Sequence, residues 1–372
     1  MAQTENGITY KDSGVSIEAG ELSVSKIRDL VSSTHDGNVI GAIGGFGGLY
    51  GLDRTDISNP VLVSSTDGVG TKSYVATMTG RFDTIGVDLV AMCVDDLVCT
   101  GARPLFLLDY VSVESLDPQI MHQIVSGVAD GCKLARCSLI GGEMAEHPRE
   151  VSSDPKITPD GKPDSFSFDL AGFAVGLVDR DKILSPQQVQ VGDVLIGVGS
   201  PGIRCNGYSL ARHVLFNLGS KNLDDPAWES SPYTLAQELL RPSVIYAPAI
   251  VDLVSNVEVH GVAHITGGGI CGNLSRVLPS GARAQVCSGT WEVPRIFCEI
   301  QEIGNISIDE MSRVFNLGIG MICVVPPHAK QPTIDLLESA GHPAHQIGTI
   351  DIGGPGPGSV IDWSGVNALR NL

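Results

Sequence analysis

Asp95-Asp-Leu-Val-Cys-Thr-Gly-Ala-Arg-Pro104 places two adjacent carboxylates near the end of an apolar segment, which glycine and proline then interrupt. A second acidic stretch, Asp67-Gly-Val-Gly-Thr-Lys72, directly follows the apolar run 61–66. A buried carboxylate is costly unless a cation or hydrogen bonds compensate it. Carboxylates next to glycines, a hydroxyl and an ammonium are typical of a site for Mg²⁺ and phosphate groups. The two stretches therefore predict chemistry on a nucleotide.

The spacing of apolar residues predicts a helix over 84–100, preceded by a strand over 61–66 and followed by one over 105–111. On that helix Asp88 and Asp95 share a face, whereas Asp96 lies about 80° around the axis from Asp88. Only part of this acidity can therefore face one metal ion. The alternative for the helix is a solvated acidic edge. The alternative for 67–72 is a polar turn with a solvated Lys72, although a metal–phosphate site fits its residues better.

The composition limits the possible partners. The chain has 372 residues, of which 42% are hydrophobic and 18% charged, so it can form a large core. Its 42 acidic residues outnumber 24 Lys and Arg, which gives a formal charge of −18. Such a surface repels nucleic acid and anionic membranes, and a phosphate site on it needs a local cation.

The cysteines and the first residues indicate the compartment. None of the nine cysteines forms a C-x-x-C pair, so we expect neither a disulfide framework nor a zinc site. Residues 1–7 are polar, and no apolar run approaches the length of a membrane span. We expect a cytoplasmic protein.

Strands and helices alternate in two successive halves, which predicts an α/β (α+β) fold in two domains. We place an N-terminal domain at 1–181, a C-terminal mixed α/β domain at 182–352 and a flexible tail at 353–372. Further strands are expected at 138–140, 170–178, 193–199, 259–265, 283–287, 318–325 and 346–351. Further helices are expected at 21–33, 117–136, 207–217, 243–255, 270–277, 291–301 and 329–340.

Several glycine-rich stretches are candidate phosphate or substrate contacts. Residues 41–51 hold six glycines but match neither a Walker A loop nor a dinucleotide fingerprint, so they predict either a lid or a close-packed turn. Thr266–Gly269 lies between a strand and a helix, where an anion is readily bound. Asn206 is a helix cap or a substrate contact. Residues 315–321 are either a strand with glycine bulges, which we favour, or a floor under a ligand. We expect His264 to be a core histidine rather than a catalytic base.

With these motifs in place, the chain resembles the phosphoribosylformylglycinamidine cyclo-ligase (aminoimidazole ribonucleotide synthetase) family over about residues 10–350. The D-x4-G-A-x-P pattern, Asp96–Pro104, is shared with a wider ATP-binding superfamily. The strings Asp67-Gly-Val-Gly-Thr-Lys72, Gly141-Gly-Glu143 and Asn206-Gly-Tyr-Ser-Leu210 are similar to the cyclo-ligases in particular. The resemblance implies ATP-dependent closure of an imidazole ring in purine biosynthesis, with Mg²⁺, a ribonucleotide substrate and a homodimer whose N-terminal sheets form a barrel.

The resemblance also implies roles for individual residues. Asp67 and Asp96 would hold Mg²⁺, with Asp88 and Asp95 in support, and Lys72, Asp96 and Asn206 are the catalytic candidates. The residues expected to contact ATP are Gly44, Gly45, Phe46, Gly47, Gly48, Asp67, Gly68, Gly70, Thr71, Lys72, Asp95, Asp96 and Glu143. Those expected at the ribonucleotide are Arg204, Asn206, Gly207, Thr266, Gly267, Gly268 and Gly269.

Two departures from the family pattern stand out. Arg204 and Cys205 replace the usual histidine and serine, so a general base cannot be carried over, and Arg204 could instead clamp a substrate phosphate. Residues 146–149 also differ, and the long loop 147–167 would be a lid or have no catalytic role.

Related families fit less well. Selenophosphate synthetases need an early reactive cysteine, whereas the first one here is Cys93 in an apolar helix, and the hydrogenase-maturation relative ends in a cysteine. Thiamine-monophosphate kinases lack the motifs that this chain has at residues 206–210 and 266–269. A catalytically inactive nucleotide-binding regulator is the alternative of another class.

Overall fold

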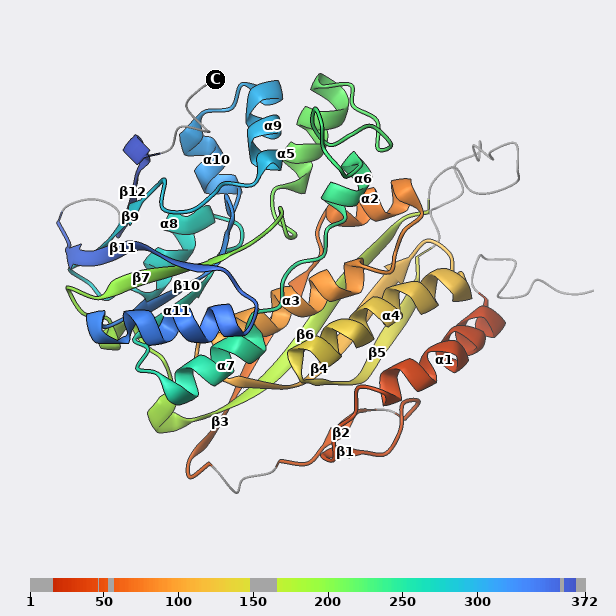
Figure 1. Cartoon of the computed structure of the whole chain (residues 1–372). Helices are drawn as coiled ribbons and strands as arrows, with labels where there is room; N and C mark the ends of the chain where they lie inside the picture. The colour runs from red at the N-terminus through yellow and green to blue at the C-terminus, as the bar shows by residue number, and fades with distance from the viewer. Residues whose placement is uncertain (1–15, 46, 53–56, 148–165, 355–357, 366–372) are drawn as a thin grey trace, which may run out of the picture.

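Two units, each built around one sheet, lie side by side in the computed structural model (Figure 1). The structure describes residues 16–45, 47–52, 57–147, 166–354 and 358–365. Within these ranges, no helix is long and apolar enough to cross a membrane. The arrangement is a mixed α/β fold in two units, as the sequence predicts.

The first unit contains a four-stranded sheet in the order β3-β6-β4-β5. Its strands are β3 (Pro60–Gly68), β4 (Arg103–Val113), β5 (Ser138–Glu146) and β6 (Phe168–Asp179). β4 and β5 run parallel, and β6 is antiparallel to both β3 and β4. A short hairpin, β1 (Val39–Ile40) and β2 (Leu49–Tyr50), precedes this sheet.

Three helices lie on one face of this sheet: α1 (Ile17–Ser32), α3 (Ile85–Val98) and α4 (Pro118–Ala135). α4 begins where its sequence predicts, because the Asp117 carboxylate accepts from the amides of Gln119 and Ile120. α3 and α4 pack backbone to backbone, since a Cβ on Gly86 would lie 2.1 Å from the Val128 nitrogen. The short α2 (Lys72–Thr79) was not anticipated from the sequence.

Large apolar side chains on the opposite face of the sheet are exposed to solvent. Leu62 on β3, Tyr110 on β4 and Phe173 on β6 are 58%, 41% and 42% exposed. Inward residues of β3 such as Val63 alternate with them and are partly buried, as strand geometry requires. Helices therefore cover one face of the sheet, whereas on the other face the described residues leave these apolar side chains exposed.

The second unit is a six-stranded sheet in the order β12-β9-β11-β7-β10-β8. Its strands are β7 (Val194–Gly199), β8 (Gly261–His264), β9 (Ala282–Cys287), β10 (Ile319–Val325), β11 (Ala344–Ile352) and β12 (Ser359–Asp362). Its helices are α5 (Tyr208–Arg212), α6 (Leu235–Leu239), α7 (Ala247–Asn256), α8 (Gly269–Leu274), α9 (Arg295–Gly304), α10 (Ile308–Val314) and α11 (Lys330–Ser339).

All the strands and helices expected from the sequence are present, with shifted ends, and some short elements were missed. The prediction of a flexible tail over 353–372 does not hold for β12, because this strand pairs in parallel with β9 and belongs to the sheet. The predicted glycine bulge is confirmed by a register shift between Ile319 and Met321. α7 begins at Ala247 rather than 243, because the segment before it is bound to carboxylates of α3.

Candidate active site between the two sheet units

Lys72 and Asp88 form an ion pair inside the protein. The ammonium Nζ lies 2.7 Å from Asp88 Oδ2, and both side chains are fully buried. Nζ also donates to the carbonyl of Arg241 at 2.7 Å, while Asp88 Oδ1 accepts from the amide and the hydroxyl of Ser243. The predicted contact of Lys72 with a phosphate is therefore replaced by a structural role. The pair joins α2 and α3 to the second unit.

Asp95 makes a second connection of the same kind. Its Oδ2 lies 3.0 Å from a terminal nitrogen of Arg204, and its Oδ1 accepts from the amides of Tyr246 and Ala247 at the start of α7. A carboxylate at a helix N-terminus is stabilised by the helix dipole. Arg204 is 3% exposed and also donates to the carbonyl of Val244. Its guanidinium is therefore not presented to a substrate phosphate, contrary to the expectation from the sequence. Arg204 and Asp95 hold the units together.

Asp96, one residue further along α3, points to a different environment. Its side chain is 45% exposed, and its Oδ1 lies 2.8 Å from Nδ1 of His264 at the end of β8. On the other side of the ring, His264 Nε2 lies 2.9 Å from an Arg204 nitrogen. A guanidinium only donates, so Nε2 must accept and Nδ1 must carry the proton that is donated to Asp96. Both ring nitrogens are therefore occupied.

Asp67 completes this acidic group from the end of β3. It is partly buried, and its Oδ1 accepts from the amide of Gly68. Burial raises the pKa of Asp67, and the charge of Asp96 raises it further, whereas the amide hydrogen bond acts in the opposite direction. Two carboxylates close enough to interact, one of them half-exposed, form a site where a cation would be stabilised.

Residues of the second unit adjoin this group. The hydroxyls of Thr71 and Ser209 lie 3.1 Å apart, which brings the loop after β3 to the start of α5. Gly207, with φ 84°, is the N-cap of α5, so Asn206 does not cap the helix. Asn206 Oδ1 is buried and has no hydrogen-bond partner among the described residues. Such atoms are rare in folded proteins and are often satisfied by a ligand.

Asn273 holds the carbonyl groups of the loop Thr266–Gly269 by hydrogen bonds. Asn273 Nδ2 donates to the carbonyl oxygens of Thr266, Gly267 and Gly269, and Asn273 Oδ1 accepts from the Thr266 hydroxyl. Within the described part of the chain, the amides of Gly267 and Gly268 have no acceptor. With its carbonyls engaged, this loop can present amides to an anion. Asn273 was not identified from the sequence.

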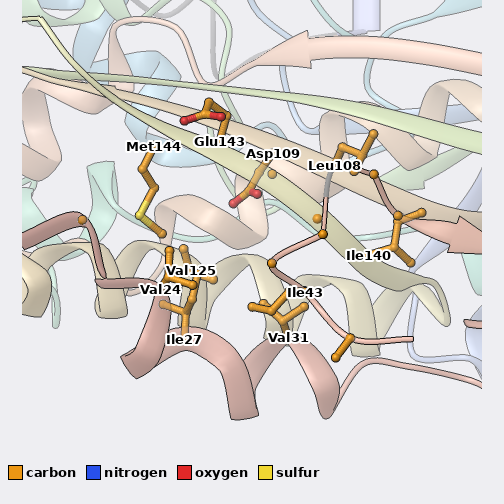
Figure 2. A pocket seen from close by; sticks show the side chains of 18 residues that line it. Val24, Ile27, Val31, Ile43, Leu108, Asp109, Val125, Ile140, Glu143 and Met144 are labelled. Carbon is orange, nitrogen blue, oxygen red and sulfur yellow. The ribbon is translucent and has the colours of Figure 1, made fainter. Parts of the chain in front are cut away.

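The remaining predicted nucleotide residues gather elsewhere. A pocket of about 630 Å³ lies between α1, the 42–48 loop, α4 and the strands β4 and β5 (Figure 2). Its lining includes Gly44, Gly45, Gly47, Gly48 and Glu143, which the sequence analysis names as expected ATP contacts, whereas Phe46 lies outside the described residues. The pocket also contains Asp109, which was not predicted. A single acid within the apolar run 105–111 would have been the signal.

The predicted site residues thus fall into three groups. Asp67, Asp96, Asn206 and residues 266–269 lie where the two units meet, together with Gly70 and Thr71. Lys72, Asp95 and Arg204 form buried ion pairs behind them. The glycines of the 42–48 loop and Glu143 line a separate pocket.

Comparison with known proteins shows the family of the chain. Residues 53–178 match the N-terminal domain and residues 190–356 the C-terminal domain of AIR synthase related proteins. The phosphoribosylformylglycinamidine cyclo-ligase of Trichlorobacter lovleyi is 45% identical over 342 residues, covering 92% of this chain and 94% of the relative. That of Bacillus cytotoxicus is 45% identical over 339 residues, covering 91% and 94%. The chain belongs to the phosphoribosylformylglycinamidine cyclo-ligase family. The predicted family, and with it the predicted class of ligase, is confirmed.

Solved structures show how widely the cyclo-ligase fold is shared. Thiamine-monophosphate kinase from Stenotrophomonas maltophilia superposes with a TM-score of 0.66 at 20% identity, covering 92% of this chain and 97% of the kinase. The hydrogenase maturation protein HypE in complex with ATP gives 0.63 at 19% identity, covering 91% and 90%. At such identities the likeness concerns the fold.

Proposed function

We propose that this chain closes the imidazole ring of aminoimidazole ribonucleotide, using formylglycinamidine ribonucleotide and ATP and releasing ADP and phosphate. Family membership supports the overall reaction. The observation that carries the proposal is the meeting of Asp67 and Asp96 from the first unit with Asn206 and the amides of residues 266–269 from the second. The two carboxylates of the first unit suit a metal-bound phosphate. Asn206 and the amides of the second unit suit an anionic substrate.

Asp67 and Asp96 would hold Mg²⁺. The donor set fits, because Mg²⁺ prefers oxygen ligands and is often held by one or two carboxylates together with substrate phosphates and water. The described residues offer no group of three or more His, Cys, Asp or Glu for a metal, which agrees with a site that the nucleotide completes. When bound, Mg²⁺ would neutralise the charge of the ATP phosphates.

The His264–Arg204–Asp95 chain would position Asp96. The Nδ1–H of His264 donates to Asp96 Oδ1, and Arg204 holds the ring from behind. Because both nitrogens are engaged, His264 acts in this proposal as an orienting group and not as a general base. Arg204 donates to Nε2 of the ring and is itself balanced by Asp95.

The second unit would bind the ribonucleotide. Asn206 and Gly207 would contact the substrate, and the free amides of Gly267 and Gly268 would receive its phosphate. ATP phosphorylates the formyl oxygen, so that an oxygen–phosphorus bond forms and the bond to ADP breaks. The amidine nitrogen then attacks the formyl carbon, loses a proton and expels phosphate. Alignment of these groups and stabilisation of the developing charge are the contributions of the protein.

The 42–48 loop and Glu143 would contact the nucleoside part of ATP. The residues that line their pocket include neither lysine nor arginine. Without a cation the pocket would not compensate the charge of phosphates, whereas an uncharged base needs no such compensation. This arrangement supports placing the base in the pocket and the phosphates toward Asp67 and Asp96.

The uncovered sheet face would be a dimer interface. Leu62, Tyr110 and Phe173 lie on the face without helices, and apolar patches of this kind commonly mark protein contacts. Two copies related by a two-fold axis would pair these faces and close the sheets into a barrel. We also propose domains at 1–181 and 182–352, with β12 joined to the second.

The test is release of ADP from Mg-ATP by the purified chain. We expect release to require formylglycinamidine ribonucleotide and to be matched by aminoimidazole ribonucleotide, measured by a coupled ADP assay and by chromatography of the product. A control omits the ribonucleotide. Absence of substrate-dependent ADP under saturating Mg-ATP would reject the function and favour a nucleotide-binding regulator.

A further inference from the structure

Asp109 is the acidic side chain that points into the pocket near α1. Adjacent residues of a strand face opposite sides, and Asp109 pairs with Gly142 across β4 and β5 whereas Tyr110 pairs with Glu143. Figure 2 accordingly shows the carboxyl of Asp109 on the side of Val24, Ile27 and Val125, and Glu143 on the other side of the strand.

Room for this carboxyl is provided by a glycine. A Cβ at Gly142 would lie 1.8 Å from Asp109 Oδ1, so any other residue would displace the acid. Among the described residues Asp109 has no ion pair, and its one hydrogen-bond partner is its own backbone amide. An acid without a partner, facing an apolar pocket, is a costly arrangement unless a ligand completes it.

The walls around Asp109 suit a flat uncharged ring. Val24, Ile27 and Val31 of α1 lie on one side, and Val125 of α4 and Met144 of β5 close the pocket around them. Pockets for small molecules commonly combine such apolar walls with a few polar groups that fix the orientation of the ligand. The volume of about 630 Å³ accommodates a purine with its ribose.

We propose that Asp109 binds the amino edge of the adenine ring and thereby selects the base of the nucleotide. The inference rests on the proposed use of ATP and names the side chain that recognises it. A neutral carboxyl has one donor and one acceptor. It can therefore accept from the 6-amino group of adenine and donate to N1 of the same ring.

The environment favours the neutral form. Burial raises the pKa of Asp109 to about 7, opposed by the hydrogen bond from its own amide. The thiol of Cys132 on α4 is the nearest other titratable group, and Cys137 lies beside Cys132. Asp67 on β3 is two strands away, because it and Asp109 both pair with Gly172 of β6, and Glu143 pairs with Tyr110 on the other face. None of these groups is a cation that would hold the carboxylate ionised.

The test combines two deletions, one on the protein and one on the ligand. The probes are Mg-ADP and the Mg-diphosphate of purine riboside, which lacks the 6-amino group, and their dissociation constants are measured by calorimetry at pH 6.5. We expect the wild type to prefer ADP about tenfold, the typical effect of one buried hydrogen bond. Asp109→Ala should bind the two probes equally.

A conservative variant separates recognition from packing. Asp109→Asn keeps one donor and one acceptor, so it should retain the preference for ADP and lose its pH dependence. In the wild type, the affinity for ADP should fall between pH 6.5 and 8.5, because the carboxylate loses its donor. Asp130→Asn makes the same chemical change on the outer surface of α4 and should behave as the wild type.

The outcomes distinguish the two proposals. If Asp109→Ala keeps the full preference while the wild type still forms ADP from ATP and ribonucleotide, the role of Asp109 is wrong and the proposed function stands. If the wild type binds neither probe and forms no ADP, both proposals fall. Thermal unfolding of each variant verifies that it is folded.

Discussion

Nζ of Lys72 lies 2.7 Å from Oδ2 of Asp88, and neither side chain is exposed to solvent. The carbonyl of Arg241 and the amide of Ser243 complete the pair, so a charge on α3 is balanced by a charge on α2 and by backbone from the second unit. Three segments distant in sequence are fixed by one contact. The same principle holds at Asp95, which joins α3 to Arg204 and to α7.

Breaking the Lys72–Asp88 pair should be strongly destabilising. We expect Lys72→Met or Asp88→Asn to lower the free energy of unfolding by about 3–5 kcal/mol, because each leaves a buried group without its partner. Urea unfolding measures the change. The exposed pair Lys133–Asp130 is the control, and its removal should cost at most about 1 kcal/mol. Equal effects at both pairs would contradict the structural role of Lys72.

Replacement of His264 should act through Asp96. In His264→Asn an amide can take the place of Nδ1 and donate to Asp96, whereas His264→Gln reaches toward Arg204 and leaves Asp96 without its donor. We expect His264→Gln to need about tenfold more Mg²⁺ than the wild type for half-maximal ADP release. His264→Asn should need less Mg²⁺ than His264→Gln, because it retains the donor to Asp96. The Mg²⁺ dependence of the coupled assay measures this. Loss of activity at all Mg²⁺ concentrations in both variants would instead indicate a role for the ring in proton transfer.

Asp96→Asn tests the proposed metal ligand directly. An amide oxygen is a weaker ligand for Mg²⁺ than a carboxylate, so the Mg²⁺ requirement should rise and kcat fall by about tenfold or more. The variant should remain folded, because Asp96 is half-exposed. Unchanged Mg²⁺ dependence would remove Asp96 from the site.

The stability of the second unit should depend on His260. Burial lowers the pKa of His260, but hydrogen bonds with Asp193 and Glu258 outweigh it, so the folded-state pKa is raised above 6.5. Its contribution to stability is therefore complete below about pH 6.5 and is lost as pH rises through the folded-state value. Thermal unfolding between pH 5.5 and 8.5 should show this loss in the wild type. His260→Gln should reduce it, and an identical pH profile in the two proteins would refute the prediction.

A charge on the uncovered sheet face should separate the dimer. We expect Phe173→Asp to give a monomer in sedimentation velocity, because a carboxylate in a closed apolar interface would be desolvated without a partner. Leu134→Asp is the matched control, since Leu134 is 61% exposed but lies on α4, on the other side of the sheet. Dissociation by both substitutions, or by neither, would contradict the proposed interface.

Regular structure was largely predictable from the sequence because it depends on neighbours in the chain. Apolar periodicity predicted α3 and α4, and Asp117 with Pro118 marked where α4 begins. Short elements such as α6 and α10 carry too few residues for a period to appear. β12 was missed because it forms by pairing with β9, which lies more than seventy residues earlier in the chain.

The sequence by itself determined the mixed α/β class, the family and the set of acidic and glycine-rich motifs, since all of these are local patterns of residue type. Only the tertiary structure decided what each charge does. Asp88 and Asp95 were expected to support the metal site of Asp67 and Asp96, yet Lys72, Arg204 and the backbone at the start of α7 compensate their charges instead. A charge is compensated by whatever the fold brings within a few ångströms, and those partners lie more than one hundred residues away for all but Lys72.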